Sequence, residues 1–334
     1  MVPTRPVEGS AIWSGPARHS SHADTVDART LLWVDAGDLC DDPAERESLP
    51  RIRPGLLAAY CHPDATEAQL TLSAKWMAWL FLLDDRIDEA ALGRDADLLA
   101  AHLHDLQATA LGTRTRATRP MSRALAEIIT EASAGTSEVW QLRFRRHVSD
   151  YLAACVWQAA HRQAAQVPRP DTFAHWRRGF GGIMPTFDLV ETFDPVERTD
   201  GGALPSCVYY SRPYQELLIA AADLVCWTND LMTVDKEAAH GDLHNLVLVT
   251  AHDRLQDRRT AAAEVSAACA RRVGTYTAAC RELARLTAAL GLPDTVQAHA
   301  DRCAAALRVW MRGHLEWGLR TPRYHAGTTR TGRD

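Results

Sequence analysis

Apolar residues recur along this chain with the three-to-four-residue spacing of amphipathic helices. No segment of the sequence shows sustained alternation of apolar and polar residues, and no internal repeat is evident. The pattern predicts helices over about 24–39, about 53–61, about 64–89, between Gly93 and Gly112, from Pro120, over about 137–166, from Asp171, from Pro213, over about 254–290 and about 294–319. We therefore expect an all-α fold, a single-domain bundle of ten or more helices around a central apolar cavity or core.

Turn-forming residues indicate where these helices begin and break. Asp64, followed by Glu67, forms a start similar to a capping box for a strong helix. The helix capped by Asp171 should be interrupted, because its apolar pattern contains the breakers Gly179, Gly181, Gly182 and Pro185. The helix over about 137–166 has inward candidates at Trp140, Phe144, Tyr151, Cys155 and Ala159. Its polar positions are supplied by Arg145, Arg146 and Arg162.

Composition is that of a globular protein without extreme charge. The 334 residues, 46% hydrophobic and 24% charged, are ample for a sizeable core. The net charge of −5 gives no support for a nucleic acid or an anionic membrane as partner. Eight cysteines are scattered without a C-x-x-C pair, which is typical of reduced thiols in a cytosolic protein rather than of a disulfide or zinc framework.

The two ends of the chain differ from the middle. Residues 1–20 are rich in Pro, Gly and Ser and lack a signal-peptide pattern, so we expect them to be disordered. Residues 325–334 are polar and are expected to form a loose tail, which leaves 21–324 as the folded domain. The longest apolar run, 76–83, is too short to span a bilayer, and we expect a cytoplasmic protein without a membrane span.

Three polar residues extend the inward face of the helix that begins at Pro213. Asn229, Thr233 and Glu237 are spaced i, i+4, i+8, so their oxygens line up over two turns. The apolar stripe that they continue consists of Leu218, Ala222 and Val225. Amide, hydroxyl and carboxylate oxygens together suit Mg²⁺ or Mn²⁺ rather than zinc or copper. The alternative is a helix end that becomes polar as it reaches water, with the Thr233 hydroxyl bonded to the main chain.

An acidic segment follows the longest apolar run. Asp84, Asp85 and Asp88 gather near the C-terminal end of a predicted helix, where the helix dipole is already negative. Each carboxylate is disfavoured there by roughly 0.3–1 kcal/mol, and mutual repulsion adds to this cost. Bound cations would relieve the repulsion. The alternative is a solvated helix end with Arg86 as the local counterion.

The two motifs together suggest one site. Both end long apolar helices and present oxygen ligands, as opposite walls of one cavity mouth would, and several Mg²⁺ ions between them would bind a diphosphate. The combination of Asp84-Asp85-x-x-Asp88 with Asn229-Asp230-Leu231-x-Thr233-x-x-x-Glu237 resembles the paired metal motifs of bacterial class I terpene synthases. Further similarity to that family lies in His240 to Asn245 and in Trp317 followed by Arg323-Tyr324. The resemblance covers nearly the whole chain from the aspartate motif onward.

This resemblance implies metal ligands in both motifs. Two of three Mg²⁺ ions would be bound by Asp84 with help from Asp88, whereas Asp85 would pair with a basic group. The remaining ion would be held by Asn229, Thr233 and Glu237.

The resemblance also implies a set of diphosphate ligands. Three of them would be Lys236, Arg323 and Tyr324. A fourth would be an arginine at the helix break. Our candidate is Arg178, because Gly181 and Gly182 after it match the family's linker and effector positions, and the alternative is Arg177. Gly181 lacks the polar side chain that the family often carries at the linker position.

The implied fold is the single-domain class I terpene synthase fold, with aromatic walls around the active-site cavity. Phe81, Phe187 and Trp310 match places where the family lines its cavity, and each ring would stabilise a carbocation by about 0.5–2 kcal/mol. Ordinary core packing is the alternative for each ring. Gly182 would turn its backbone carbonyl toward the cation, because it has no side chain.

The implied activity is Mg²⁺-dependent ionisation of a linear isoprenoid diphosphate and cyclisation of the resulting carbocation, with release of pyrophosphate. Farnesyl diphosphate is the commonest substrate in the family and geranylgeranyl diphosphate is the second. The product would be a sesquiterpene or a diterpene, respectively. The chain could also form a homodimer.

Three other hypotheses have some support. A prenyl diphosphate synthase is also all-α and Mg²⁺-dependent, but it carries two aspartate-rich motifs where this chain has one. A di-iron bundle would fit the E-x-x-H sequence from Glu237 to His240, but it needs two copies. A non-catalytic protein that binds an isoprenoid diphosphate would have no need of intact ligand motifs.

Overall fold

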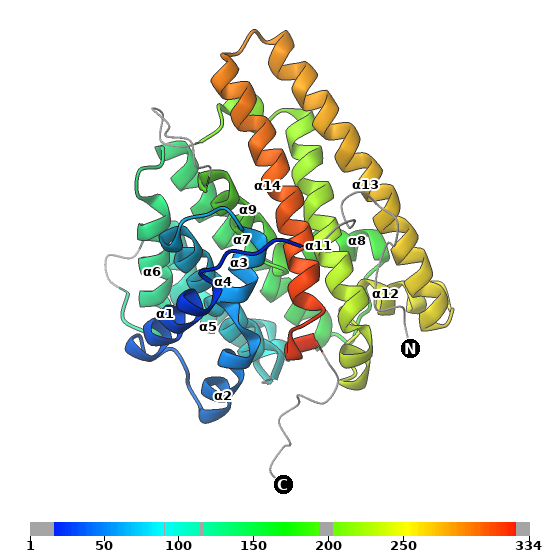
Figure 1. The fold of residues 1–334 in the computed structure, drawn as a ribbon. Coiled ribbons are helices and arrows are strands. Elements are labelled where there is room, and N and C mark those ends of the chain that lie inside the picture. The colour runs from blue at the N-terminus through cyan, green and yellow to red at the C-terminus, as the bar shows by residue number, and fades with distance from the viewer. Residues whose placement is uncertain (1–16, 90, 114–116, 194–202, 325–334) are drawn as a thin grey trace.

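The computed structural model describes residues 17–89, 91–113, 117–193 and 203–324 (Figure 1). These residues form α-helices and two short 3₁₀ helices and contain no strand, so the all-α prediction is confirmed for this part of the chain. The predicted disordered N-terminus and loose C-terminal tail fall outside it, except that residues 17–20 are described and form no helix. The elements are α1 (Ala23–Ala36), α2 (Pro43–Ile52), α3 (Pro54–Cys61), α4 (Glu67–Glu89), η1 (Ala91–Arg94), α5 (Ala96–Leu111), α6 (Pro120–Ser133), α7 (Glu138–Gln163), α8 (Pro170–Phe180), α9 (Ile183–Thr192), α10 (Ser206–Tyr209), α11 (Arg212–Ala239), α12 (Leu246–Asp253), α13 (Arg258–Ala289), α14 (Asp294–Gly318) and η2 (Pro322–Tyr324).

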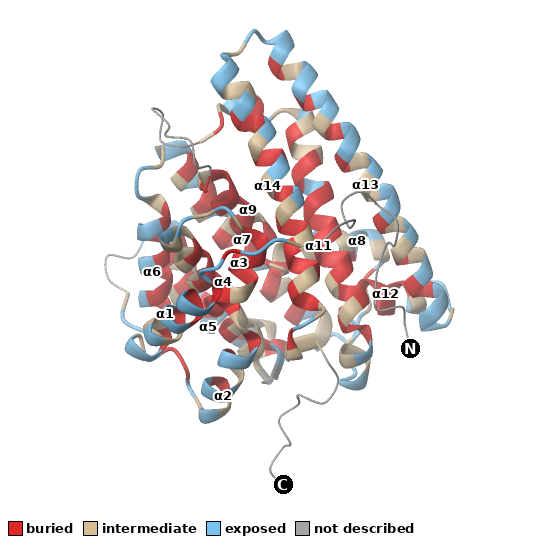
Figure 2. Cartoon of the chain, in the orientation of Figure 1, coloured by how far each residue is buried: buried red, intermediate tan, exposed pale blue. Residues whose placement is uncertain are grey.

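Helix α11 runs through the centre of the molecule, with α13 and α14 packed along it (Figure 1). Its predicted inward residues Leu218, Ala222 and Val225 are at most 3% exposed. By length and hydropathy α11 could cross a membrane, but 83% of its most apolar stretch is buried inside the protein (Figure 2). A helix that is apolar on all sides and buried by its neighbours is a core helix.

Helix α4 forms a second wall of the core. It packs against α1, α3 and α6, and its two tryptophans, Trp76 and Trp79, are fully buried and stack with ring centroids 5.4 Å apart. The Trp76 indole nitrogen donates to Thr186 Oγ1 at 2.8 Å, and the Trp79 indole nitrogen donates to the Met121 carbonyl at 3.0 Å. The apolar run of α4 therefore joins α6 on one side and α9 on the other.

The predicted helix interruption separates α8 from α9 at Gly181 and Gly182. Gly182 has a φ of 63°, in the left-handed region that residues with a Cβ rarely adopt. An added Cβ at this position would also lie 3.1 Å from Leu80 Cδ2 on α4. Pro185 lies in the first turn of α9, where its missing N–H leaves no hydrogen bond unmade.

Buried ion pairs fix α9, beyond this break, against α7. Arg143 on α7 donates from Nε to Asp188 Oδ1 at 2.9 Å and from Nη2 to Glu191. His147 Nδ1 lies 2.6 Å from Asp188 Oδ2, and the Arg143 guanidinium carbon lies 3.6 Å from the ring centroid of Tyr209. Because every charge in this group has a partner, the second half of the broken helix has a fixed position.

Helix boundaries differ from the predictions at several places, and the short helix α10 was not predicted either. Helix α4 starts after Thr66 instead of at Asp64, because Thr66 and Gln69 exchange hydrogen bonds: Thr66 N donates to Gln69 Oε1 at 2.9 Å and Gln69 N donates to Thr66 Oγ1 at 3.3 Å. Helix α2 was not predicted, although Asp42 caps it through Ala44 N at 2.8 Å. The long helix predicted from about 254 is preceded by a separate short helix, α12.

Candidate active site

A cavity of about 890 Å³ lies between α4, α7, α8, α11 and α14. Along both α4 and α11 the lining changes from apolar to polar toward the C-terminal end. Met77 and Leu80 precede Asp84 on α4, and Val225 precedes Asn229 on α11. The cavity thus combines an apolar wall with one polar edge, and its volume lies within the range of about 300–1,000 Å³ that is common for small-molecule sites.

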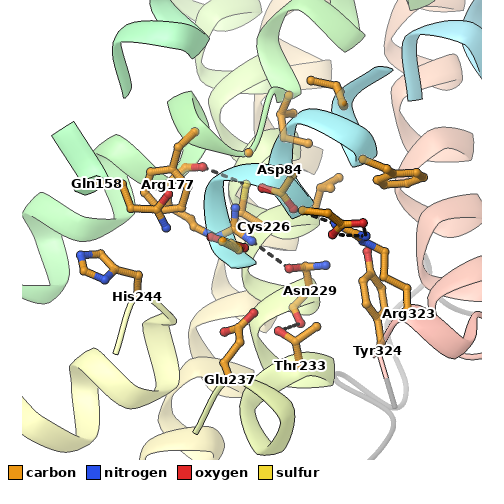
Figure 3. A pocket seen from close by; sticks show the side chains of 18 of the residues that line it. Asp84, Gln158, Arg177, Cys226, Asn229, Thr233, Glu237, His244, Arg323 and Tyr324 are labelled. Atoms are coloured by element: carbon orange, nitrogen blue, oxygen red, sulfur yellow. Dashed lines mark hydrogen bonds and ion pairs between the residues drawn. The ribbon is translucent and has the colours of Figure 1, made fainter. Parts of the chain in front are cut away.

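The two predicted motifs meet at this polar edge (Figure 3). Asp84 from α4 lies at the same cavity as Asn229, Thr233 and Glu237 from α11. Asp88 of α4 also lines this cavity. Because the two motifs are far apart in the sequence, the fold could instead have placed them on unrelated surfaces. The structure therefore brings together all five residues for which we predicted a metal-binding role.

The side chains on α11 form an oxygen-rich group. The Thr233 hydroxyl donates to the Asn229 carbonyl at 3.0 Å, which is the main-chain bond considered as an alternative. Its oxygen accepts from Asn245 Nδ2 at 3.5 Å, so one lone pair remains available. Glu237 Oε2 accepts from Asn245 Nδ2 at 2.7 Å. Burial, and then the negative charge of Asp230, raise the pKa of Glu237 to about 8. A cation beside Glu237 would relieve both effects.

These donors suit a hard divalent cation. Carboxylate, amide and hydroxyl oxygens are the ligands preferred by Mg²⁺. Among the described residues no group of three or more His, Cys, Asp or Glu side chains is arranged as a metal site. The α11 group contains a single carboxylate, so a cation bound there would complete its coordination with water and with substrate oxygens, as Mg²⁺ commonly does.

The aspartates of α4 are paired with an arginine from the C-terminal end of the domain. Arg323 in η2 donates from Nη2 to Asp84 Oδ2 and from Nη1 to Asp85 Oδ2, both at 2.8 Å. Its guanidinium carbon lies 4.8 Å from the ring centroid of Phe81. Arg86, considered as the local counterion, instead donates from Nε to Glu45 Oε1 on α2 at 2.8 Å. The basic partner of Asp84 and Asp85 is therefore Arg323.

The two arginines at the helix break differ in where their side chains lie. Arg178, the predicted candidate, is not among the residues that line the cavity, and its Nη1 donates to Asp223 Oδ1 on α11 at 2.7 Å. Arg177 lines the cavity and donates from Nη2 to Asn229 Oδ1 and from Nε to Asp230 Oδ1, both at 2.8 Å. The reason is geometric, since consecutive residues on a helix point about 100° apart.

Glycine at position 181 leaves room for the Arg177 guanidinium. A Cβ there would lie 2.9 Å from Arg177 Nη1 and 3.2 Å from Cys226 Sγ. Gly181 also lines the cavity, whereas Gly182 does not. The Gly182 carbonyl accepts a hydrogen bond from the Thr186 hydroxyl at 2.7 Å, so the predicted dipole of Gly182 is directed into α9.

The other predicted substrate contacts fall into two groups. Lys236, Tyr324, Phe81 and Trp310 line the cavity. Phe187 does not line it but packs edge-on against Trp310, with ring centroids 5.7 Å apart. Phe187 therefore supports the wall from behind.

Sequence reasoning missed two lining residues on α7. Gln158 and Arg162 line the cavity together with Tyr151. Arg162, which the pattern assigned to the polar side of the helix, has a side chain only 8% exposed. Spacing could have revealed both residues, because they lie seven and eleven positions after Tyr151 and share its helix face.

Comparison with known proteins identifies the family. The family described as "Terpene synthase family 2, C-terminal metal binding" matches residues 75–275, a range that contains both motifs. A curated relative from Streptomyces clavuligerus, (-)-delta-cadinene synthase, is 72% identical over 332 residues, which is 99% of each chain. This chain belongs to the terpene synthases. A (+)-T-muurolol synthase from Roseiflexus castenholzii is 31% identical and covers 91% of this terpene synthase and 90% of its own length.

Solved structures agree with this assignment. A single-residue variant of cucumene synthase superimposes on the terpene synthase with a TM-score of 0.80 at 27% identity, covering 93% of this chain and 99% of that one. Linalool/nerolidol synthase from Streptomyces clavuligerus gives a TM-score of 0.79 at 30% identity, with 95% and 100% covered. The predicted family, fold class and enzyme class are confirmed, and the di-iron, prenyl diphosphate synthase and non-catalytic hypotheses are set aside.

Proposed function

We propose that this terpene synthase cyclises farnesyl diphosphate to a cadinene-type sesquiterpene with release of pyrophosphate. The observation that carries the proposal is the 72% identity to a (-)-delta-cadinene synthase over 99% of both chains. The T-muurolol synthase relative, which is described as cyclising (2E,6E)-farnesyl diphosphate, supports the same substrate. Geranylgeranyl diphosphate, with a diterpene product, is the second candidate from the sequence resemblance.

Three Mg²⁺ ions are the cofactor in this proposal. Asp84 and Asp88 would hold ions on the α4 side, and Asn229, Thr233 and Glu237 would hold one on the α11 side. The hard-oxygen donor set and the match to a metal-binding family support this assignment. What bound Mg²⁺ supplies is positive charge beside the leaving diphosphate, which favours cleavage of the allylic C–O bond.

Basic side chains around the polar edge would orient the diphosphate. Arg177, Lys236 and Arg323 line the cavity beside the two motifs, and Tyr324 adds a hydroxyl donor. Guanidinium groups suit this task because their planar donors match the geometry of phosphate oxygens. Bound in this way, the diphosphate end would lie at the polar edge and the isoprenoid chain would extend along the apolar wall.

The apolar wall would control the carbocation without reacting with it. Phe81, Trp310 and Phe180 present rings to the cavity and offer cation–π attraction of about 0.5–2 kcal/mol each. The wall also excludes water, which would otherwise capture the cation early. No protein nucleophile is required by this mechanism.

Product analysis with a set of substrates tests the proposal. The purified protein is incubated with Mg²⁺ and with geranyl, farnesyl or geranylgeranyl diphosphate, and volatile products are analysed by gas chromatography and mass spectrometry alongside a pyrophosphate assay. A C15 bicyclic hydrocarbon from farnesyl diphosphate alone, without isopentenyl diphosphate, is the expected result. A C20 product as the preferred outcome, or no pyrophosphate release from any of the three, would overturn it.

A further inference from the structure

A buried arginine joins two segments of the cavity lining that are far apart in the sequence. Arg162 lies near the C-terminal end of α7, and its Nη2 is 2.8 Å from Asp88 Oδ1 on α4 and 2.5 Å from Asp242 Oδ2 in the segment between α11 and α12. Its side chain is only 8% exposed. All three residues line the cavity. One guanidinium therefore connects the aspartate motif to the segment that follows the second motif.

The acceptor on the α11 side is itself held in place. His244 N donates to Asp242 Oδ1 at 3.0 Å, and His244 Nδ1 lies 3.1 Å from the same oxygen. The backbone N–H of Asp242 donates to the Glu237 carbonyl at 3.1 Å. Asp242 is thus anchored to the last turn of the helix that carries the second motif. A displacement of Asp242 would therefore also displace Glu237.

The space around Arg162 is fitted to a guanidinium. Gly93 in η1 is buried, and a Cβ there would lie 3.2 Å from Arg162 Nη1. Two carboxylates, those of Asp88 and Asp242, share the positive charge, and without it they would repel each other in a partly dry environment. Arginine can donate to both through a planar group, whereas lysine offers a single point charge.

We propose that Arg162 is a positioning residue for the cyclisation reaction: it ties α4 to the segment after α11 and closes this side of the cavity to water. The catalytic part of the proposal rests on the proposed function. Arg162 sets the place of Asp88 at the polar edge and keeps the segment around Asp242 against α7. Loss of the tie would let both segments separate, so that water reaches the carbocation before cyclisation is complete.

The tie is tested first without substrate, by hydrogen–deuterium exchange. The variants are Arg162→Gln and Asp242→Asn, and the matched control is Arg146→Gln, which removes an exposed arginine paired with Asp150 on the same helix. Both tie variants should exchange faster than the parent protein in residues 84–89 and 240–246 and as slowly as the parent in α13. Parental exchange of both segments in Arg162→Gln would overturn the proposal.

Products distinguish positioning from simple stabilisation. With farnesyl diphosphate, Arg162→Gln should raise the share of water-captured alcohols severalfold, and Arg162→Lys should fall between that variant and the parent. An unchanged product ratio in Arg162→Gln, whatever its melting temperature, would overturn the positioning role.

If Arg162→Gln does not fold, the same measurements on Arg162→Lys and Asp242→Asn decide. Absence of any product from the parent would contradict the proposed function, and the exchange measurement would still decide whether the tie exists.

Discussion

Arg178 donates to Asp223 at 2.7 Å, and this pairing turns it away from the cavity that its neighbour Arg177 lines. Asp223 is fully buried and also pairs with Arg272 of α13 at 2.5 Å. Arg177 is thus directed at Asn229 in the second motif. Arg178, through Asp223, holds α8, α11 and α13 together. Adjacent residues of the same type serve different purposes, and substitutions can separate them.

Arg177→Gln should reduce turnover by about 100-fold or more, because the proposed donor to the developing diphosphate charge is lost. Arg178→Gln should retain most of the activity and instead lower the free energy of unfolding by about 1–3 kcal/mol, because Asp223 loses one of its two partners. Steady-state kinetics and urea unfolding of both variants check this. Equal losses of turnover in the two would contradict the assignment.

Asp84→Ala and Asn229→Ala should each abolish turnover while the protein stays folded. Both side chains are oxygen donors at the polar edge, and neither belongs to the apolar core. Asp235→Asn on α11 is the control, because Asp235 is exposed and its nearest basic group is Arg258 at 3.5 Å. Circular dichroism verifies folding and product analysis measures turnover. Cyclisation retained by either alanine variant would refute the metal-binding role of that residue.

Removal of divalent ions should stop the reaction reversibly. After treatment with a chelator, the protein should make no product, and excess Mg²⁺ should restore activity. The reason is that the proposed basic side chains alone do not neutralise the charge of the leaving diphosphate. The melting temperature without substrate should change little, since the core is built from apolar helix contacts. Product formation that resists chelation would contradict the Mg²⁺-dependent mechanism.

Phe81→Leu should slow pyrophosphate release by roughly tenfold, the equivalent of about 1–2 kcal/mol of lost cation–π and stacking interaction. The Phe81 ring stacks on Trp317 with centroids 5.6 Å apart and lies beneath Arg323. Phe187→Leu is the comparison, because Phe187 lies behind Trp310 and outside the cavity lining. It should lower stability more than rate, and a larger rate loss in Phe187→Leu than in Phe81→Leu would reverse this interpretation.

The buried ion pairs of α7 and α9 predict a pH dependence of stability. Burial opposes the charge on His147, but the neighbouring Asp188 carboxylate outweighs it and raises the pKa of His147 above its ordinary value of 6.5. The stabilisation is fully present below pH about 6.5 and is lost as the pH rises through the higher folded-state pKa. Urea unfolding of the parent and of His147→Gln checks this. The stability difference between them should shrink with rising pH, and a difference that grows would refute it.

The sequence was sufficient to predict the fold class and both motifs, because helical periodicity and oxygen-ligand spacing are local properties. Periodicity did not decide whether Arg177 or Arg178 faces the cavity, since the helix is broken just after them and its phase depends on how α8 docks on α11. Arg162 was not predicted to be buried, although its spacing from Tyr151 places it on the inward face of α7. We assigned it to the polar side because it is basic, and the acidic partners that the fold brings to it explain its burial.

Helix α11 is at once the middle of the core and the carrier of the second motif. Three consecutive alanines, Ala220, Ala221 and Ala222, are fully buried on it. Larger side chains there would displace α11 from its neighbours and would move Asn229 and Glu237 relative to α4, because the helix shifts as a rigid unit. We therefore expect residues that never meet the substrate, such as these alanines, to influence which terpene leaves the enzyme.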